Sequence, residues 1–379
     1  MRALLLLAGA AQAAYPSART IIRSTNGTCA ALARRLDDNL WPRLETALRH
    51  AKAPAVQVFA NAAHSILLEN FLCGLPAQNL RDHVVVWAAD AETNARMRTY
   101  LPAARVVDVS NAFGDSVDAP FRSQAYAAFA AVKAFMPYAA AALGFAVLTQ
   151  DADVVWLADV PAYLERFDAA ALADSPRVDT RTRPCRRKEA ALLRPYLVSD
   201  RQRADHDAAL RAKGKFTYDA QACRRHRCVD SVNGGFLYYG SGRVRAALEH
   251  WAASCGAIVE ERKNQPSLVD ALKQTLGRAG CRYDEDPRNT TAAVWPEALA
   301  APLVVLNQDL FVSGRRAAFA REAKAKNALL AFHANFLFGW RAKCEKLRRL
   351  GLLFVDVADG DVCRDQGASE SRVVTCKSR

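Results

Sequence analysis

Residues 146–157 read Ala-Val-Leu-Thr-Gln-Asp-Ala-Asp-Val-Val-Trp-Leu. An apolar run ends in two carboxylates, Asp151 and Asp153, and a second apolar run follows at once. Residues two apart in a strand face the same side, so we expect these two carboxylates to converge. Two hard oxygen ligands at the end of a buried strand suit Mg²⁺ or Mn²⁺. The stretch therefore predicts a metal-binding strand end, and its alternative interpretation is a solvated strand-to-loop turn.

Strands alternate with helices on the N-terminal side of this stretch. The alternation predicts an α/β fold built on a doubly wound, mostly parallel sheet. Such sheets bind ligands at the carboxyl ends of their strands, where Asn61, Asp90 and the two aspartates fall. The apolar runs predict strands at 55–60, 84–90 and 105–109, and helices at 65–75, 92–100 and 124–143.

The alternation weakens after Pro161. Residues from about 177 to 230 are polar, arginine-rich and without a clear period, and we interpret them as an insertion. We therefore expect one large domain at 50–350, interrupted by this insertion, and a C-terminal tail at 351–379. Beyond the insertion, strands are expected at 231–239, 303–306 and 331–335, and helices at 243–253 and 264–276.

The charge of the chain favours anionic partners. The 379 residues are 51% hydrophobic and 24% charged, with a net charge of +13. Most of the excess lies in the insertion, which we interpret as a solvated surface, with docking of an acidic acceptor as the alternative. No nucleic-acid recognition module is visible, and aromatic residues do not alternate with the arginines. Both observations argue against a nucleic-acid partner.

The N-terminus resembles a signal peptide. Residues 1–13 combine a basic Arg2, a short apolar run and a small-x-small cleavage site. The run is too short to span a membrane, and no later stretch reaches about 20 apolar residues, so we expect no transmembrane span. Asn26 and Asn289 begin glycosylation acceptor sequences. These signals predict the secretory pathway, either the Golgi lumen or secretion.

Ten cysteines agree with an oxidising compartment, where an even number suggests several disulfides. Cys223 and Cys228 bracket a loop that is short enough to close locally, and Cys363 and Cys376 could staple the C-terminal tail. A zinc site at Cys223, His226 and Cys228 is less favoured, because no second ligand pair follows at a suitable spacing.

Four sequence blocks occur in a recognisable order. Together they resemble the nucleotide-diphospho-sugar transferases and, among these, glycosyltransferase family 77, which includes plant cell-wall xylosyltransferases and arabinosyltransferases. The resemblance covers about residues 55–350 without the insertion. The blocks are Asp151-Ala152-Asp153, Asn233-Gly234-Gly235-Phe236, Asn264-Gln265-Pro266, and His333-Ala334-Asn335-Phe336 with Gly339 and Lys343.

This resemblance implies a GT-A fold and a sugar transfer that retains the anomeric configuration. The implied donor is a nucleotide-diphospho-sugar, in particular a UDP-sugar, and the implied acceptor is a glycan or a glycoprotein. The family pattern implies a role for each matching residue. Asp151, Asp153 and His333 would hold Mn²⁺ or Mg²⁺, and Lys343 would touch the diphosphate. Asn233, Gly234 and Gly235 would approach the donor sugar, and Gln265 would lie near its anomeric carbon. Gly339, in the last block, would belong to the substrate-binding residues, and Lys133 would reach donor hydroxyls or phosphate.

One position departs from the family pattern. The family usually has Asp where this chain has Asn264, and an amide can act neither as a base nor as a carboxylate stabiliser. Either Gln265 is the residue near the anomeric carbon, or another carboxylate serves, with Glu260 and Glu261 close in sequence.

Two further classes of protein remain as alternatives. A catalytically weak sugar-nucleotide or glycan-binding protein would keep the fold, and Asn264 favours it. A secreted metal-dependent phosphodiesterase would act on nucleotide sugars, but it would need more His and Asp ligands than the sequence offers.

Overall fold

The computed structural model describes fifteen segments of the chain, with gaps between them. The predicted signal peptide, the predicted insertion at 177–230, the two acceptor asparagines and the Cys223/Cys228 pair lie outside them. The described residues are 17–22, 27–37, 40–112, 123–165, 167, 169–173, 232–240, 244–276, 281–283, 303–306, 311–314, 320, 329–357, 363 and 374–377.

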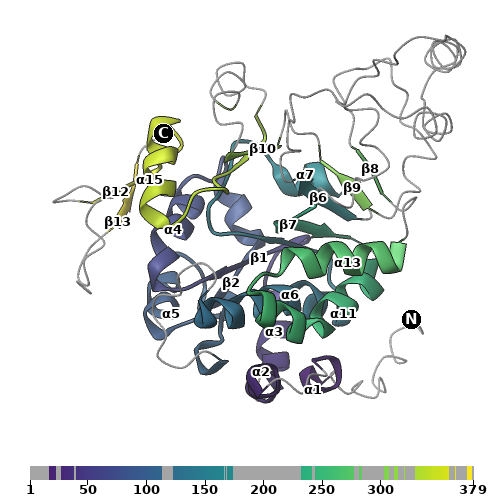
Figure 1. The fold of residues 1–379 in the computed structure, drawn as a ribbon. Coiled ribbons are helices and arrows are strands. Elements are labelled where there is room, and N and C mark those ends of the chain that lie inside the picture. Colours follow the sequence, from purple (N-terminus) through teal and green to yellow (C-terminus); the bar gives the residue numbers. More distant parts are fainter. Residues whose placement is uncertain are drawn as a thin grey trace, which may run out of the picture.

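An eight-stranded sheet forms the centre of the molecule, in the order β3-β2-β1-β4-β7-β6-β9-β8 (Figure 1). Strand β7 runs antiparallel to both of its neighbours, and the other described pairs are parallel. The predicted mostly parallel α/β sheet is therefore confirmed, and it is consistent with a GT-A-like fold. The strands are β1 Ala55–Ala60, β2 Val84–Ala88, β3 Val106–Asp108, β4 Val147–Gln150, β6 Ala169–Ala173, β7 Val232–Tyr239, β8 Cys281–Tyr283 and β9 Leu303–Val305.

Helices cover both faces of this sheet (Figure 1). In β2, Val85 and Trp87 pack into one hydrophobic cluster, whereas Val84 and Val86 pack into the other, as alternation along a strand requires. The first cluster is built with α1 Ala18–Ile21, α2 Gly27–Asp37, α3 Leu40–Arg49, α6 Gln124–Ala142, α11 Arg245–Ala253, α12 Cys255–Glu261 and α13 Gln265–Leu276. The second is built with α4 Ser65–Cys73, α5 Ala91–Met97, α7 Val160–Leu164 and α15 Trp340–Arg349.

Two smaller sheets complete the described structure. The strands β10 Phe311–Ser313, β11 Ala331–His333 and β5 Val154–Trp156 form one, with β11 in the middle. In the predicted tail, β12 Val355–Val357 and β13 Val374–Cys376 pair antiparallel. None of the described helices has both the length and the apolar composition needed to cross a membrane.

Disulfides tie distant segments together. The prediction that Cys363 and Cys376 staple the tail is confirmed, because each of them bonds to a helix of the main body. The described bonds are Cys29–Cys255 between α2 and α12, Cys73–Cys376 between α4 and β13, and Cys344–Cys363 between α15 and the tail.

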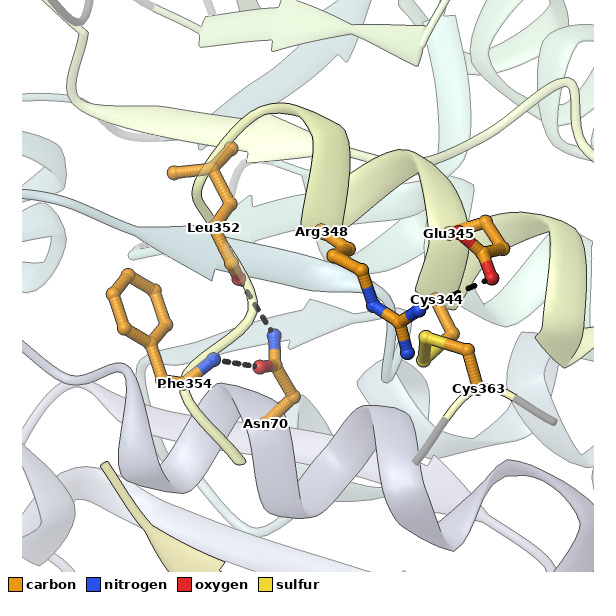
Figure 2. Close-up of a disulfide and its surroundings, with 7 residues drawn as sticks. All are labelled: Asn70, Cys344, Glu345, Arg348, Leu352, Phe354 and Cys363. Carbon is orange, nitrogen blue, oxygen red and sulfur yellow. Dashed lines mark hydrogen bonds and ion pairs between the residues drawn. A yellow bond between two sulfur atoms is a disulfide. The ribbon is translucent and has the colours of Figure 1, made fainter. Parts of the chain in front are cut away.

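Asn70 on α4 reinforces the docking of the segment that follows α15 (Figure 2). Its Nδ2 donates a hydrogen bond to the Leu352 carbonyl at 3.1 Å, and its Oδ1 accepts one from the Phe354 N–H at 2.6 Å. Asn70 is fully buried, so water cannot replace either bond without local opening. The Cys344–Cys363 bond lies nearby and ties α15 to the tail.

We expect Asn70→Ala to lower the free energy of unfolding by about 2–3 kcal/mol, because it removes two hydrogen bonds and leaves buried backbone groups without partners. Thermal or urea unfolding under oxidising conditions measures the loss. Glu345→Gln is the control, since the Glu345–Arg348 pair is half exposed and contributes less than about 0.5 kcal/mol. Equal stability of the two variants would contradict this account of Asn70.

Candidate active site

The two aspartates lie where the chain leaves the large sheet for the small one. Strand β4 ends at Gln150, residues 151–153 form a turn, and β5 begins at Val154. The aspartates therefore follow the end of a buried strand, as predicted, but their carboxylates converge through the turn and not through the alternation of side chains along a strand. The Asp151 N–H donates to the Gly235 carbonyl at 2.8 Å, and the Asp153 carbonyl accepts from the Ala334 N–H at 3.0 Å. Neighbouring strands thus fix the turn on both sides.

His333 reaches the same point from β11. Because β11 pairs antiparallel with β5, His333 lies opposite Val154, one residue beyond the turn. Its Nε2 is 3.5 Å from Asp151 Oδ2 and 3.3 Å from Asp153 Oδ1. The three residues each offer a ligand atom within 4.8 Å of the others. The buried Nδ1 of the ring has no hydrogen-bond partner among the described residues, and Nε2 faces the two carboxylates.

Strand β7 passes directly against this group. A Cβ on Gly235 would lie 2.4 Å from Asp151 Oδ2 and 2.7 Å from His333 Cε1, so no side chain fits there. A Cβ on the preceding Gly234 would meet its nearest atoms at an ordinary 3.8 Å. The Asn233 Oδ1 accepts a hydrogen bond from the Gly235 N–H at 2.6 Å. Gly235 is therefore the residue whose lack of a side chain lets Asp151 and His333 approach each other.

Two lysines neutralise the two carboxylates. Lys133, on α6, forms an ion pair with Asp151 Oδ1. Lys343, on α15, places its Nζ 2.9 Å from Asp153 Oδ2. The helices come from opposite faces of the sheet, so the site draws its positive charge from both layers.

The mutual proximity of these charges shifts their pKa values. Burial alone would raise the pKa of Asp151 and Asp153, but Lys133 beside Asp151 and Lys343 beside Asp153 outweigh it, and both carboxyl pKa values fall below their ordinary range. Burial alone would lower the pKa of His333, yet the two carboxylates raise it to about 9. The site is therefore strongly polarised at neutral pH, with two carboxylates that stay ionised.

These groups line one cavity of about 920 Å³. Its volume suits a ligand larger than a free sugar or an inorganic phosphate. Most of the site residues predicted from the sequence lie in its wall: Asn61, Lys133, Asp151, Asp153, Asn233, Gly234, Gly235, Asn264, Gln265, His333, Gly339 and Lys343.

A family model described as nucleotide-diphospho-sugar transferase matches residues 79–347, well over half of the chain. The chain belongs to the nucleotide-diphospho-sugar transferase family. It is therefore a glycosyltransferase of a family whose donors are nucleotide-diphospho-sugars. No curated protein matches the chain.

Among solved structures, the chain is similar to the apo structure of the bifunctional glycosyltransferase WbbM, with 10% sequence identity and a TM-score of 0.37. The similarity covers 78% of this chain and 49% of the other, so the chain spans about half the length of that protein.

Asp90 does not line the cavity of this transferase-family protein, unlike the other predicted residues at the sheet edge. One carboxylate oxygen accepts a hydrogen bond from the Thr93 N–H at the start of α5, and the other accepts one from the Ala62 N–H, both at 2.7 Å. Asp90 thus caps a helix and fixes the segment after β1. The structure thus gives Asp90 a capping role, and a substrate-binding role for it stays a prediction.

Asn264 and Gln265 lie at the start of α13 and line the cavity. The Asn264 carbonyl accepts hydrogen bonds from Trp251 Nε1 at 2.9 Å and from the Leu268 N–H at 3.1 Å, which anchor it. Its side-chain Nδ2 lacks a partner within the described part of the chain. Glu260 and Glu261 are exposed and are not part of the cavity wall. They therefore do not supply the carboxylate that Asn264 lacks.

The sequence prediction missed the aromatic part of the wall in this transferase. Phe59, Tyr126 and Phe129 line one portion, and the Phe59 and Phe129 rings meet edge to face at 5.4 Å. Phe336 and Phe338 line another portion, between His333 and Lys343 in sequence. The run Phe-Leu-Phe after Asn335 is the signal that could have found them, because an apolar run in a loop is unusual.

Proposed function

We propose that this glycosyltransferase is metal-dependent and moves the sugar of a UDP-sugar to a glycan or glycoprotein acceptor with retention of configuration. The observation that carries the proposal is the convergence of Asp151, Asp153 and His333 in one cavity with two lysines. Carboxylate and imidazole ligands suit Mn²⁺ or Mg²⁺, and ammonium groups suit a diphosphate.

Asp151, Asp153 and His333 would hold the ion. They fit it, because one ligand atom of each lies within 4.8 Å of the others and His333 Nε2 faces the same two carboxylates. When bound, a divalent ion supplies positive charge to the diphosphate that leaves the donor sugar.

The lysines exchange partners when the donor binds. In the free site, Lys133 and Lys343 each pair with a carboxylate that the ion would require. A diphosphate would bring oxygens that accept hydrogen bonds from these ammonium groups, which would leave Asp151 and Asp153 available to hold the ion. Lys343 then stabilises the leaving phosphate, and Lys133 binds donor phosphate or hydroxyl groups. The protein would therefore bind the donor more tightly when the ion is present, and the ion more tightly when the donor is present.

The donor sugar lies against the backbone of Asn233 to Gly235, with Gln265 near the anomeric carbon and Asn264 beside it. Among the described lining residues, Asp151 and Asp153 are the ones that carry a carboxylate. Both pair with a lysine and would hold the ion. Hence no other described carboxylate of the wall can act as a nucleophile or a base. This favours retention by attack on the face that the diphosphate leaves, with a phosphate oxygen taking the acceptor proton.

The resemblance to glycosyltransferase family 77 supports a hexosyl or pentosyl donor, and the transferase domain is assigned to residues 50–350. The described disulfides, which form and persist in oxidising compartments, support the secretory pathway, including the Golgi lumen, as the location.

A catalytically weak sugar-nucleotide-binding protein is the second candidate, and Asn264 is the observation that favours it, since the amide replaces a carboxylate. Such a protein would keep the affinity for UDP and the ion but would turn over no donor.

We expect UDP release from at least one member of a UDP-sugar panel in the presence of Mn²⁺, and its loss when EDTA is added. Restoration by excess Mn²⁺ is the control for damage by the chelator. Release that is insensitive to EDTA would contradict the metal site. A folded protein that binds UDP with Mn²⁺ but releases none from any donor would favour the binding-protein candidate.

A further inference from the structure

Two phenylalanines expose their rings to the active-site cavity. Phe338 is 73% exposed and Phe336 is 39% exposed, and they are the large hydrophobic side chains that are exposed in the described part of the chain. Both line the cavity that contains the aspartates and lysines. Apolar side chains of this size that face water inside a ligand cavity mark a contact surface for a ligand.

The loop that carries these rings has a defined backbone. It joins β11, which ends at His333, to α15, which begins at Trp340. Phe336 has a φ of 62°, an unfavourable value for a residue with a side chain. The neighbouring Asn335 accepts a hydrogen bond at its Oδ1 from the Gly314 N–H at 2.7 Å. A strained residue in an anchored loop is typical of a functional position.

The place of the loop in the chain determines which part of the reaction it adjoins. It lies between His333, a ligand of the proposed ion, and Lys343, the proposed diphosphate contact. In a retaining transfer by same-face attack, the bond from the anomeric carbon to phosphate breaks as the bond to the acceptor oxygen forms, and the acceptor proton passes to phosphate. The acceptor must therefore approach beside the leaving diphosphate, next to this loop. This inference rests on the proposed function.

We propose that Phe336 and Phe338 form an acceptor platform that takes a sugar ring. One face of a pyranose or furanose presents C–H groups, which pack on an aromatic ring while the hydroxyl groups stay in water. A phenyl ring offers no donor to a phosphate oxygen, so these side chains do not serve the diphosphate. The acceptor that this surface fits is a glycan, and its terminal sugar packs on the rings.

The test uses the full chain loaded with UDP and Mg²⁺, and a panel of methyl glycosides of hexoses and pentoses as probes. Saturation-transfer NMR measures their binding, and calorimetry measures UDP binding. We expect at least one glycoside to bind through the C–H protons of one face. Phe338→Ala abolishes that signal, Phe338→Tyr retains it, and Phe338→Leu weakens it, because leucine keeps apolar area but offers no ring face. For a transferred glycoside, Phe338→Ala raises the acceptor KM about tenfold.

The outcomes distinguish failure of the acceptor platform from failure of the proposed function. If no glycoside binds the loaded protein, or if Phe338→Ala binds as well as the wild type, the acceptor platform is wrong. If Phe338→Ala instead weakens UDP binding, the ring contacts the nucleotide, and the assignment to the acceptor is also wrong. If the wild-type protein fails to bind UDP with Mg²⁺, the proposed function is wrong, and the acceptor platform, which rests on it, is wrong as well. Because Phe338 is largely exposed, the substitutions leave the fold intact.

Discussion

Asp153→Asn is expected to reduce sugar transfer by about a thousandfold or more while the protein still folds. Asp153 is 3% exposed, and its two oxygens face His333 and Lys343. The amide has nearly the same shape but lacks the charge that a divalent ion requires. The fold tolerates the change because Lys343 is partly exposed and can turn to water. UDP release at saturating donor and Mn²⁺ measures the effect, and circular dichroism verifies the fold.

Glu345→Gln is the matched control for this experiment. It removes one carboxylate from α15, the helix that carries Lys343, but Glu345 pairs with Arg348 and is not part of the cavity wall. Transfer by this variant should equal that of the wild type. Full activity of Asp153→Asn, with or without chelator, would rule out the aspartate turn as the metal site.

Gly235→Ala is expected to lower transfer by about a hundredfold or more, although it adds only one methyl group. That methyl would lie 2.4 Å from Asp151 Oδ2 and 2.7 Å from His333 Cε1, so one of the two ligands must move. A ligand displaced by about 1 Å costs about a hundredfold in rate. Mn²⁺ binding, followed by electron paramagnetic resonance, should weaken together with the rate of UDP release.

Gly234→Ala provides the control on the same strand. Its new methyl would contact its neighbours at 3.8 Å, which is ordinary packing, so Asp151 and His333 need not move and Mn²⁺ affinity should stay within about threefold of the wild type. Similar losses in both variants would mean that the β7 backbone, and not the space between Asp151 and His333, limits the site.

The sequence alone predicts much of the sheet, because its buried strands are apolar runs bounded by turn residues. It also predicts that Asp151, Asp153 and His333 belong to one site, since the two aspartates stand together and His333 belongs to a recognisable block, and the structure brings the three together. Their geometry is not predictable in this way. Whether residues 146–157 make one strand or two depends on β7 and β11, which pair with the chain on either side of the turn.

Side-chain direction is a second limit on prediction from sequence. Asn61 and Asp90 both follow parallel strands and reach the same edge, yet Asn61 lines the cavity and Asp90 bonds to backbone N–H groups. The free N–H groups at the start of α5 attract the carboxylate, and this competition is invisible in a strand pattern. The pairing of Cys73 with Cys376 is equally invisible, because it follows from the packing of the tail on α4.

The disulfide bond between α4 and β13 has a consequence for the synthesis and folding of the chain. Cys73 and Cys376 are separated by 303 residues. At 5–20 residues per second, translation of that interval takes about 15–60 s, during which the thiol of Cys73 is exposed to other cysteines of the growing chain. Asn70 likewise forms its hydrogen bonds only after Leu352 and Phe354, which follow it by more than 280 residues, have been made. The docking of the tail on α4 must therefore wait until residues 352–376 have been made, and oxidative folding decides how many chains reach the native pairing of Cys73 with Cys376.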